Sequence, residues 1–243
     1  MKICLAQSRF HRGDIRANLD THQQLINIAA ENEVEAIFFP ELSLTGYEPS
    51  QVQELYFKEN DIRLLPFNVM SQEHSMIIGL GVPIKTGEGI TIAMVIFEPD
   101  KQLQYHHKSH LHDDEKPFFV SGPNLPSSEM GNGQIALSIC YELAVASHAE
   151  KALALGAMVY LSSVAKHRKG VAGAYRRMSE IAEHQQVFTM MVNAIGESED
   201  GLCAGNSAVW DSTGQLLCRL SASKEGLLIF DTQTTETQSI YIS

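Results

Sequence analysis

Short runs of apolar residues, rich in β-branched side chains, recur along the chain and predict strands that are buried in a sheet. We expect strands at residues 2–7, 36–39, 76–82, 90–98, 102–106, 135–139, 157–161, 187–194 and, as the last one, 227–230. Other segments space their apolar residues along one face of a helix. These helices are expected at residues 18–32, 143–155 and 175–186. The alternation of strands and helices predicts an α/β fold.

Turn-forming residues separate several of these segments. Gly87 and Gly89 mark one turn. The expected strands at residues 90–98 and 102–106 are joined by Pro99, Asp100 and Lys101, which predicts a β-hairpin. A second hairpin is expected over residues 201–217, with its turn at residues 211–214. Residues 48–74 are expected to form loop and irregular helix. No linker, repeat or low-complexity segment interrupts the sequence, so we expect one domain over residues 1–243.

Composition narrows the function classes. The chain has 243 residues, 44% of them hydrophobic, and a formal net charge of -11 at pH 7. An acidic protein lacks the basic face that nucleic acid or an anionic membrane requires, so we expect neither as a partner. The sequence has no secretory signal and no apolar run near the ~18 residues that span a bilayer, which favours a cytoplasmic protein. Its four cysteines, at positions 4, 140, 203 and 218, show no CxxC pairing and are expected to be free thiols.

Cys140 stands between an expected buried strand and an expected helix, that is, at a strand-to-helix elbow. Backbone N–H groups at the start of a helix stabilise a thiolate and can later stabilise an oxyanion. Cys140 is therefore a candidate nucleophile. The alternative is that it is a small buried hydrophobic residue, as free cysteines usually are. Cys203 and Cys218 stand at no such elbow and are expected to be packing residues.

Two further segments carry candidate chemistry. Glu41 directly follows an expected strand, and catalytic groups of open α/β sheets gather at the carboxyl ends of strands. Glu41 is thus an acid/base candidate, although an isolated glutamate is more often a solvated loop residue. Lys108 lies in a dense polar segment with Glu115 a few residues later, and an ammonium beside an acid and a thiol can stabilise an oxyanion. The alternative for Lys108 is a surface lysine.

The same polar segment also permits a metal site. His106, His107, His110 and His112, with Asp113 and Asp114, offer imidazole and carboxylate ligands to a divalent metal. Their spacing matches no closed zinc pattern, so we do not expect a metal or another cofactor. Further along, residues 166–169 form a basic patch. This patch either meets an anionic substrate or a partner subunit, or is the solvated face of a helix.

Three separated motifs resemble the nitrilase superfamily of carbon–nitrogen hydrolases, and its amidase-like branch in particular. They are FPELSLTGY at residues 39–47, YHHKSHL at residues 105–111 with Glu115 behind it, and SICYE at residues 138–142. The resemblance implies a four-layer α-β-β-α sandwich and a homodimer or larger homo-oligomer. It also implies that Glu41 is the general base, Lys108 the oxyanion stabiliser and Cys140 the nucleophile, with Glu115 as an additional carboxylate.

This resemblance predicts hydrolysis of a carbon–nitrogen bond through a thioester, with a small-molecule amide as substrate and Tyr47, Tyr141 and Glu142 in its binding site. Hydrolysis of a nitrile or a carbamoyl compound, acyl transfer, and a non-catalytic binding protein are the alternatives. Residues 143–148 lack the Arg and Pro that many members carry after the cysteine. We therefore expect an amide with a neutral or distantly charged acyl group. A basic residue over the pocket, from Lys166, Arg168, Arg176 or Arg177, would reverse that expectation.

Overall fold

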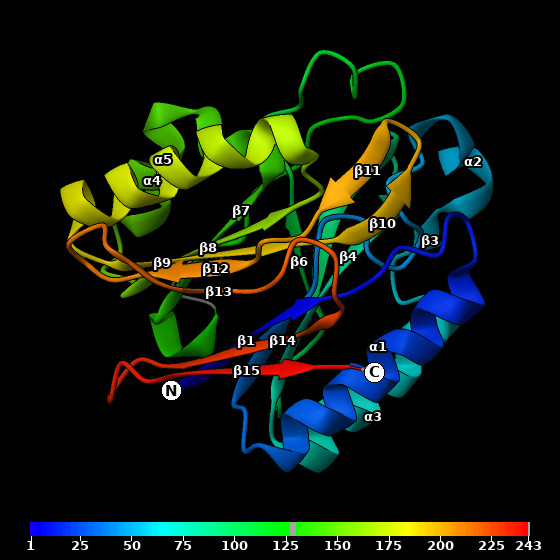
Figure 1. Cartoon of the computed structure of the whole chain (residues 1–243). Coiled ribbons are helices and arrows are strands. Elements are labelled where there is room, and N and C mark those ends of the chain that lie inside the picture. The colour runs from blue at the N-terminus through cyan, green and yellow to red at the C-terminus, as the bar shows by residue number, and fades with distance from the viewer. Residues whose placement is uncertain (127–129, 243) are drawn as a thin grey trace.

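The computed structural model describes residues 1–126 and 130–242, and two β-sheets that face each other dominate it (Figure 1). The larger sheet has the strand order β15-β14-β1-β2-β4-β5-β6, and β3 pairs with β4. Its strands are β1 (Lys2–Gln7), β2 (Ala36–Phe38), β3 (Phe57–Lys58), β4 (Ile77–Lys85), β5 (Ile90–Phe97), β6 (Gln104–His107), β14 (Gly226–Asp231) and β15 (Thr237–Tyr241). β1, β2 and β4 are parallel, whereas β4, β5 and β6 form an antiparallel meander.

The smaller sheet has the order β13-β12-β9-β8-β7, in which β7, β8 and β9 are parallel. Its strands are β7 (Ile135–Ile139), β8 (Val159–Val164), β9 (Phe188–Asn193), β12 (Ala208–Trp210) and β13 (Leu216–Arg219). β10 (Ile195–Ser198) and β11 (Gly201–Ala204) form a separate hairpin. The two sheets are connected where β2 and β8 end, because Ser163 Oγ donates to the carbonyl oxygen of Phe39 at 2.9 Å.

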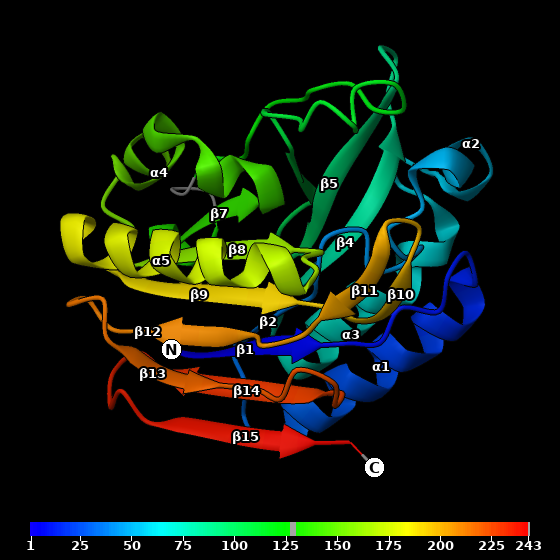
Figure 2. The same ribbon diagram turned by 45° about the horizontal axis from the view of Figure 1, so that its top comes forward.

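Helices cover the outer face of each sheet (Figures 1 and 2). α1 (Ile15–Glu31) and α3 (Leu65–His74) cover the larger sheet, and α4 (Ala146–Leu153) and α5 (Arg168–Gln185) cover the smaller one. The alternation of side chains along the strands explains this arrangement. In β1, Ile3 and Leu5 belong to the core between the sheets, whereas Cys4 and Ala6 pack with α1 and α3. The expected α-β-β-α sandwich is confirmed.

Several element boundaries differ from the expected ones. The first helix begins at Ile15 because Asp14 is its N-cap and accepts a hydrogen bond from the backbone N–H of Ala17. The segment expected as one helix over residues 143–155 is instead a 3₁₀ helix, η5 (Cys140–Ala144), followed by α4. α5 begins seven residues before Tyr175, so the basic patch is continuous with the helix. Within residues 48–74 the structure forms α2 (Val52–Leu55), β3 and α3.

The expectation that residues 227–230 form the last strand is wrong, because β15 follows and pairs with β14. β15 is an edge strand whose residues are mostly exposed, so its sequence lacks the apolar run that marks a buried strand. The hairpin of β10 and β11 was also not predicted, whereas the β12–β13 turn at residues 211–214 is confirmed. Among the described residues, no helix is both long and apolar enough to cross a membrane.

Candidate active site

Cys140 lies directly after β7, where the chain leaves the smaller sheet and enters η5. Its φ angle is 45°, in the left-handed region that residues other than glycine rarely adopt. Such backbone strain is concentrated at functional sites. Ile139 is buried, but Cys140 is partly exposed. The predicted elbow is thus confirmed, and it presents a cysteine that a small molecule can reach.

Glu41 lies in the turn that follows β2 of the larger sheet. The backbone of this turn passes directly over Gly81 of β4. A Cβ atom at residue 81 would overlap the carbonyl oxygen of Pro40 and lie 2.5 Å from the backbone nitrogen of Leu42. Glycine is therefore required at this position for the turn to pack on the sheet. The sequence signal was the position of Glu41 at a strand end, and the structure adds the reason why the turn can lie there.

Lys108 follows β6, and its ammonium group lies between two carboxylates. Its Nζ donates to Glu41 Oε1 at 2.7 Å and to Glu115 Oε1 at 2.6 Å. The hydroxyl of Tyr47 also donates to Glu115 Oε1, at 3.2 Å. The side chains of Glu41, Lys108 and Glu115 are almost completely buried. Four of the predicted site residues therefore form one hydrogen-bonded cluster.

The two carboxylates differ in how many of their oxygens are occupied. Glu115 Oε2 accepts the backbone N–H of His112 at 2.8 Å, so both Glu115 oxygens are bound. Glu41 Oε1 is bound to Lys108, but Glu41 Oε2 is buried and has no hydrogen-bond partner among the described residues. Burial raises the pKa of the Glu41 carboxyl, and the neighbouring Cys140 thiol partly offsets this effect. Glu41 Oε2 is thus an unused acceptor beside the candidate nucleophile.

The pKa of the Cys140 thiol is raised to about 11, chiefly by burial and also by the charge of Glu41. Lys166 and Lys108 lower this pKa, but they do not outweigh the other two effects. The helix start was expected to stabilise a thiolate, and the pKa direction is opposite to that expectation. At neutral pH the thiol is protonated, so it requires a base before it can attack an electrophile.

The pKa values of Glu41 and Lys108 are both raised. Burial raises the pKa of Glu41, the charge of Lys108 lowers it, and the neighbouring Glu115 raises it further. Burial alone would lower the pKa of Lys108, but the charges of Glu41, Cys140 and Glu115 outweigh that effect. Burial and the same two carboxylates also raise the pKa of the Tyr47 hydroxyl. Lys108 is therefore cationic at neutral pH, and its raised pKa makes Glu41 a stronger base than an ordinary glutamate.

Tyr141 and Glu142 directly follow the nucleophile, but they lie in different surroundings. The side chain of Tyr141 is exposed, with its ring 5.2 Å from that of His112 in a T-shaped contact. Glu142 is completely buried. The Tyr141 ring is thus free to contact a bound molecule, whereas direct contact between Glu142 and a substrate is not favoured by this geometry.

The Glu142 carboxylate connects the segment of Lys108 to the segment of Cys140. Its Oε1 accepts the backbone N–H of Ser109 at 2.7 Å, the Ser109 hydroxyl at 2.8 Å and Asn124 Nδ2 at 2.9 Å. Its Oε2 accepts the backbone N–H of Ile139 at 2.8 Å. Ser109 and Asn124 were not singled out in the sequence, where the only signal was that Ser109 follows Lys108. We conclude that Glu142 fixes the relative positions of the two segments.

The histidines of residues 106–112 have separate partners and do not converge. His106 Nδ1 accepts the backbone N–H of Leu125 at 3.1 Å, and His107 Nδ1 bonds Thr91 Oγ1 at 2.8 Å. Within residues 1–126 and 130–242, no group of three or more His, Cys, Asp or Glu residues is arranged to hold a metal ion. The alternative of a metal site built on this patch is not supported by the side-chain geometry.

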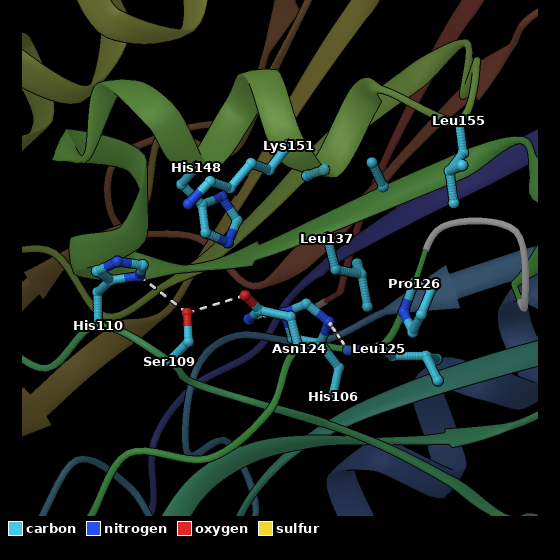
Figure 3. Close-up of a pocket in the computed structure, with 12 residues that line it drawn as sticks. His106, Ser109, His110, Asn124, Leu125, Pro126, Leu137, His148, Lys151 and Leu155 are labelled. Carbon is cyan, nitrogen blue, oxygen red and sulfur yellow. Dashed lines mark hydrogen bonds between the residues drawn. The ribbon is translucent and has the colours of Figure 1, made fainter.

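A cavity of about 420 Å³ lies beside the Glu142 network (Figure 3). Figure 3 shows His110, Ser109 and Asn124 joined by hydrogen bonds at one side of this cavity, with His148 and Lys151 across from them. Neither Cys140 nor any of the three buried charged residues beside it lines this cavity. None of the four candidate catalytic residues therefore lines this cavity, although Ser109, which does line it, directly follows Lys108 in the sequence.

Two helix-covered sheets hold a reachable cysteine beside a buried lysine and two carboxylates, and these are the groups that covalent catalysis by a cysteine requires. The sequence profile described as Carbon-nitrogen hydrolase matches residues 2–241. The chain therefore belongs to the carbon–nitrogen hydrolase family, and Glu41, Lys108 and Cys140 are all present in it. The amidase-like resemblance of the three motifs agrees with this result.

Individual relatives share less than 30% of their residues with this chain. An (R)-stereoselective amidase from Pseudomonas sp is 27% identical over 224 residues, which cover 89% of this chain and 80% of the amidase. A glutamine-dependent NAD(+) synthetase from Aquifex aeolicus (strain VF5) is 24% identical over 237 residues, 94% of this chain but 41% of the synthetase. The chain thus spans about two fifths of that synthetase.

Among solved structures, an amidase from Nesterenkonia sp. AN1 superimposes with a TM-score of 0.84 at 24% sequence identity. The match covers 95% of this chain and 92% of the amidase. In that structure acrylamide has added to the active-site cysteine of the amidase. The superposition shows that the two proteins share a fold.

Proposed function

We propose that the protein hydrolyses a small-molecule amide to a carboxylate and ammonia or an amine, with Cys140 as nucleophile and a thioester as intermediate. The observation that carries this proposal is the cluster beside Cys140, in which Lys108 Nζ contacts Glu41 at 2.7 Å and Glu115 at 2.6 Å. A nucleophile, a base and an oxyanion stabiliser are the groups that acyl transfer requires.

Glu41 is the base in this proposal because its Oε2 is the carboxylate oxygen without a hydrogen-bond partner in the described cluster. It removes the proton from the Cys140 thiol, whose pKa of about 11 keeps it protonated at neutral pH. The thiolate attacks the amide carbonyl, and the proton on Glu41 is then transferred to the leaving nitrogen. The carbon–nitrogen bond breaks, and the acyl group remains on Cys140.

The negative oxygen of the tetrahedral intermediate is stabilised by Lys108 and by the backbone N–H of Tyr141, at the start of η5. Both groups are held in place before the reaction, by the carboxylates and by the helical turn respectively. In the second half of the reaction Glu41 activates a water molecule, which hydrolyses the thioester. Glu115 has both oxygens bound, so its role in this scheme is to hold Lys108 and to keep the charge cluster balanced.

An amide substrate is supported by two arguments. An amide needs an acid that protonates the leaving nitrogen, and the cluster contains a carboxyl with a raised pKa. Amidases and a glutamine-dependent enzyme are among the relatives, and glutamine is itself a primary amide. We further propose that Tyr47 and Tyr141 contact the substrate, since Tyr47 is hydrogen-bonded to the cluster and Tyr141 is exposed beside Cys140. Glu142 is assigned instead to positioning.

The experiment that tests this proposal is an assay of ammonia release from simple amides, dicarboxylic monoamides, carbamoyl compounds and nitriles. Each is measured with the wild-type protein and with Cys140→Ala, in the presence and absence of EDTA. We expect an amide to be the best substrate, with turnover that is insensitive to EDTA and lost in the variant. Faster release from a nitrile than from every amide would contradict the amide assignment. Loss of activity with EDTA would contradict the mechanism.

Three further properties are part of the proposal. We propose a single domain over residues 1–243, which is supported by a core that both sheets share, from Ile3 to Phe230.

A cytoplasmic location is supported by four free cysteines, as is usual in a reducing compartment. A homodimer or larger homo-oligomer is supported by large apolar side chains that are exposed, such as Leu155 and Met158. Light scattering of the purified protein tests the assembly, and a monomer at all concentrations would refute it.

A further inference from the structure

Lys166 lies beside Cys140 although 26 residues separate them in the sequence. β7 and β8 are parallel neighbours, with Ile139 paired to Ser163, so both residues lie just beyond the carboxyl ends of adjacent strands. Asn193 fixes the backbone of Lys166 on both sides. Its Oδ1 accepts the Lys166 N–H at 2.8 Å, and its Nδ2 donates to the Lys166 carbonyl oxygen at 3.0 Å. The side chain therefore begins from a fixed position next to the nucleophile.

The ammonium of Lys166 differs from that of Lys108 in having no partner. Lys108 is bound by two carboxylates, whereas Lys166 makes no ion pair or side-chain hydrogen bond with the described residues. Lys166 is also only partly exposed. Its charge lowers the pKa of the Cys140 thiol more than that of Lys108 does, which agrees with a location close to the sulfur. A cation that is partly withdrawn from water and unpaired favours binding of an anion.

A cavity of about 390 Å³ adjoins Lys166, between Leu143 and Ala144 of η5 on one side and α5 on the other. Arg176, Arg177 and Glu180 also line it. Arg177 lies 3.6 Å from Glu180 and donates to the carbonyl oxygen of Leu143 at 3.2 Å, so the single carboxylate of this lining already has a cationic neighbour. The remaining charge of this cavity is positive. Cys140 does not line it, and Lys166 is the lining residue that connects the cavity to the nucleophile.

We propose that Lys166 binds a carboxylate on the acyl part of the substrate, so that the substrate is an amide with a carboxylate some carbons away from the reacting carbonyl. A monoamide of a short dicarboxylic acid has this chemistry. This inference rests on the proposed amide hydrolysis and names its substrate class. A carboxylate directly beside the carbonyl would lie against Glu41 and Glu115, which repel it, whereas a distant one reaches the unpaired ammonium.

The test compares two matched substrates, glutaric acid monoamide and the neutral pentanamide, in the wild-type protein and in Lys166→Gln. We expect the wild-type protein to favour the monoamide at least tenfold in kcat/KM. Lys166→Gln also removes a charge that lowers the pKa of Cys140, an effect that both substrates share. It is therefore expected to lower kcat/KM for the monoamide at least tenfold more than for the neutral amide, with the additional loss mainly in KM. Lys166→Arg is expected to restore most of the preference, because it restores the charge.

Lys169→Gln is the matched control, since Lys169 is an exposed lysine of the same segment that does not line the cavity. It should change neither substrate, and far-ultraviolet circular dichroism should show that all variants are folded. An equal loss for both substrates in Lys166→Gln would assign Lys166 to the electrostatics of Cys140 and overturn the inference. A wild-type preference for pentanamide would also overturn it. If the wild-type protein hydrolysed no amide at all, the proposed function itself would fail.

Discussion

Substitution of Glu142 by Gln tests whether this buried carboxylate fixes the catalytic segments. Four groups donate hydrogen bonds to it: the backbone N–H groups of Ser109 and Ile139, the Ser109 hydroxyl and Asn124 Nδ2. His106 Nε2 and His148 Nε2 also lie 3.7 and 3.4 Å from its Oε2. Gln replaces one oxygen by an NH₂ group, which faces these donors with another donor. At least one buried N–H then loses its acceptor, at a cost of about 1–3 kcal/mol, and charge-assisted bonds are weakened as well.

We therefore expect Glu142→Gln to lower the free energy of unfolding by about 2–4 kcal/mol at pH 7. For a protein of this size that corresponds to a decrease in Tm of roughly 4–15 °C. The measurement is urea unfolding followed by circular dichroism. Glu150→Gln is the control, because Glu150 is exposed on α4, and it should change stability by less than about 0.5 kcal/mol.

The stability effect of Glu142→Gln is also expected to depend on pH. Burial alone would raise the pKa of Glu142, but the nearby imidazoles of His106 and His148 and the hydrogen bond from Asn124 hold it well below its usual range. A carboxyl with a lowered pKa stabilises the fold at pH values above its unfolded pKa of about 4.3, and this stabilisation is lost as pH falls towards its folded pKa. The stability difference between wild type and Glu142→Gln should thus shrink below about pH 4.

Glu142→Gln is also expected to lower the rate of catalysis. Since Ser109 adjoins Lys108 and Ile139 adjoins Cys140, loss of the Glu142 contacts is expected to lower kcat about 10- to 100-fold, by misplacing the reacting groups, with a smaller effect on KM. Equal unfolding free energies of Glu142→Gln and wild type at pH 7 would refute the reasoning. A change in KM alone would assign Glu142 to the binding of substrate.

Two other predictions concern the charge cluster. Glu41→Gln is expected to lower kcat at least ~10³-fold, and an unchanged kcat would exclude Glu41 as the base. The pH dependence of Cys140 alkylation in this variant should give an apparent thiol pKa below the value of about 11 in the wild-type protein, because the Glu41 charge that raises this pKa is gone. Lys108→Met is expected to lower kcat at least ~10²-fold, because the oxyanion loses its cation. It is also expected to destabilise the fold by about 3–5 kcal/mol, because Glu41 and Glu115 remain buried without a counter-charge. Urea unfolding measures this loss, and wild-type stability would contradict the stabilising role of the Lys108 ion pairs.

Some of the site could be predicted because its residues stand at strand ends. Glu41 and Cys140 each follow a run of buried apolar residues, Glu41 at the carboxyl end of β2 in the larger sheet and Cys140 at the carboxyl end of β7 in the smaller sheet. The role of Glu142 was not predictable, because its partner Ser109 is 33 residues away and approaches only when β6 and β7 are assembled. Local sequence likewise cannot tell whether Lys166 is solvated or lies beside a thiol.

The buried parts of the fold were predictable from the sequence, whereas exposed strands and exact helix boundaries were not. Buried strands such as β1 and β14 have continuous apolar runs and were found, whereas the exposed edge strand β15 was missed. Helix boundaries depended on single contacts, such as the Asp14 cap of α1. The helix expected over residues 143–155 is interrupted at Val145, whose backbone is extended, and a pattern of apolar spacing does not contain that information.

The central claim is that Cys140 is the nucleophile, and titration with iodoacetamide tests it most directly. Peptide mass spectrometry is used to measure alkylation at each cysteine while amide hydrolysis is measured in the same samples. The account predicts that activity falls in proportion to the alkylation of Cys140, while Cys4 and Cys203, which are buried, remain unmodified. Loss of activity with Cys140 unmodified, or full activity with Cys140 completely alkylated, would contradict the account.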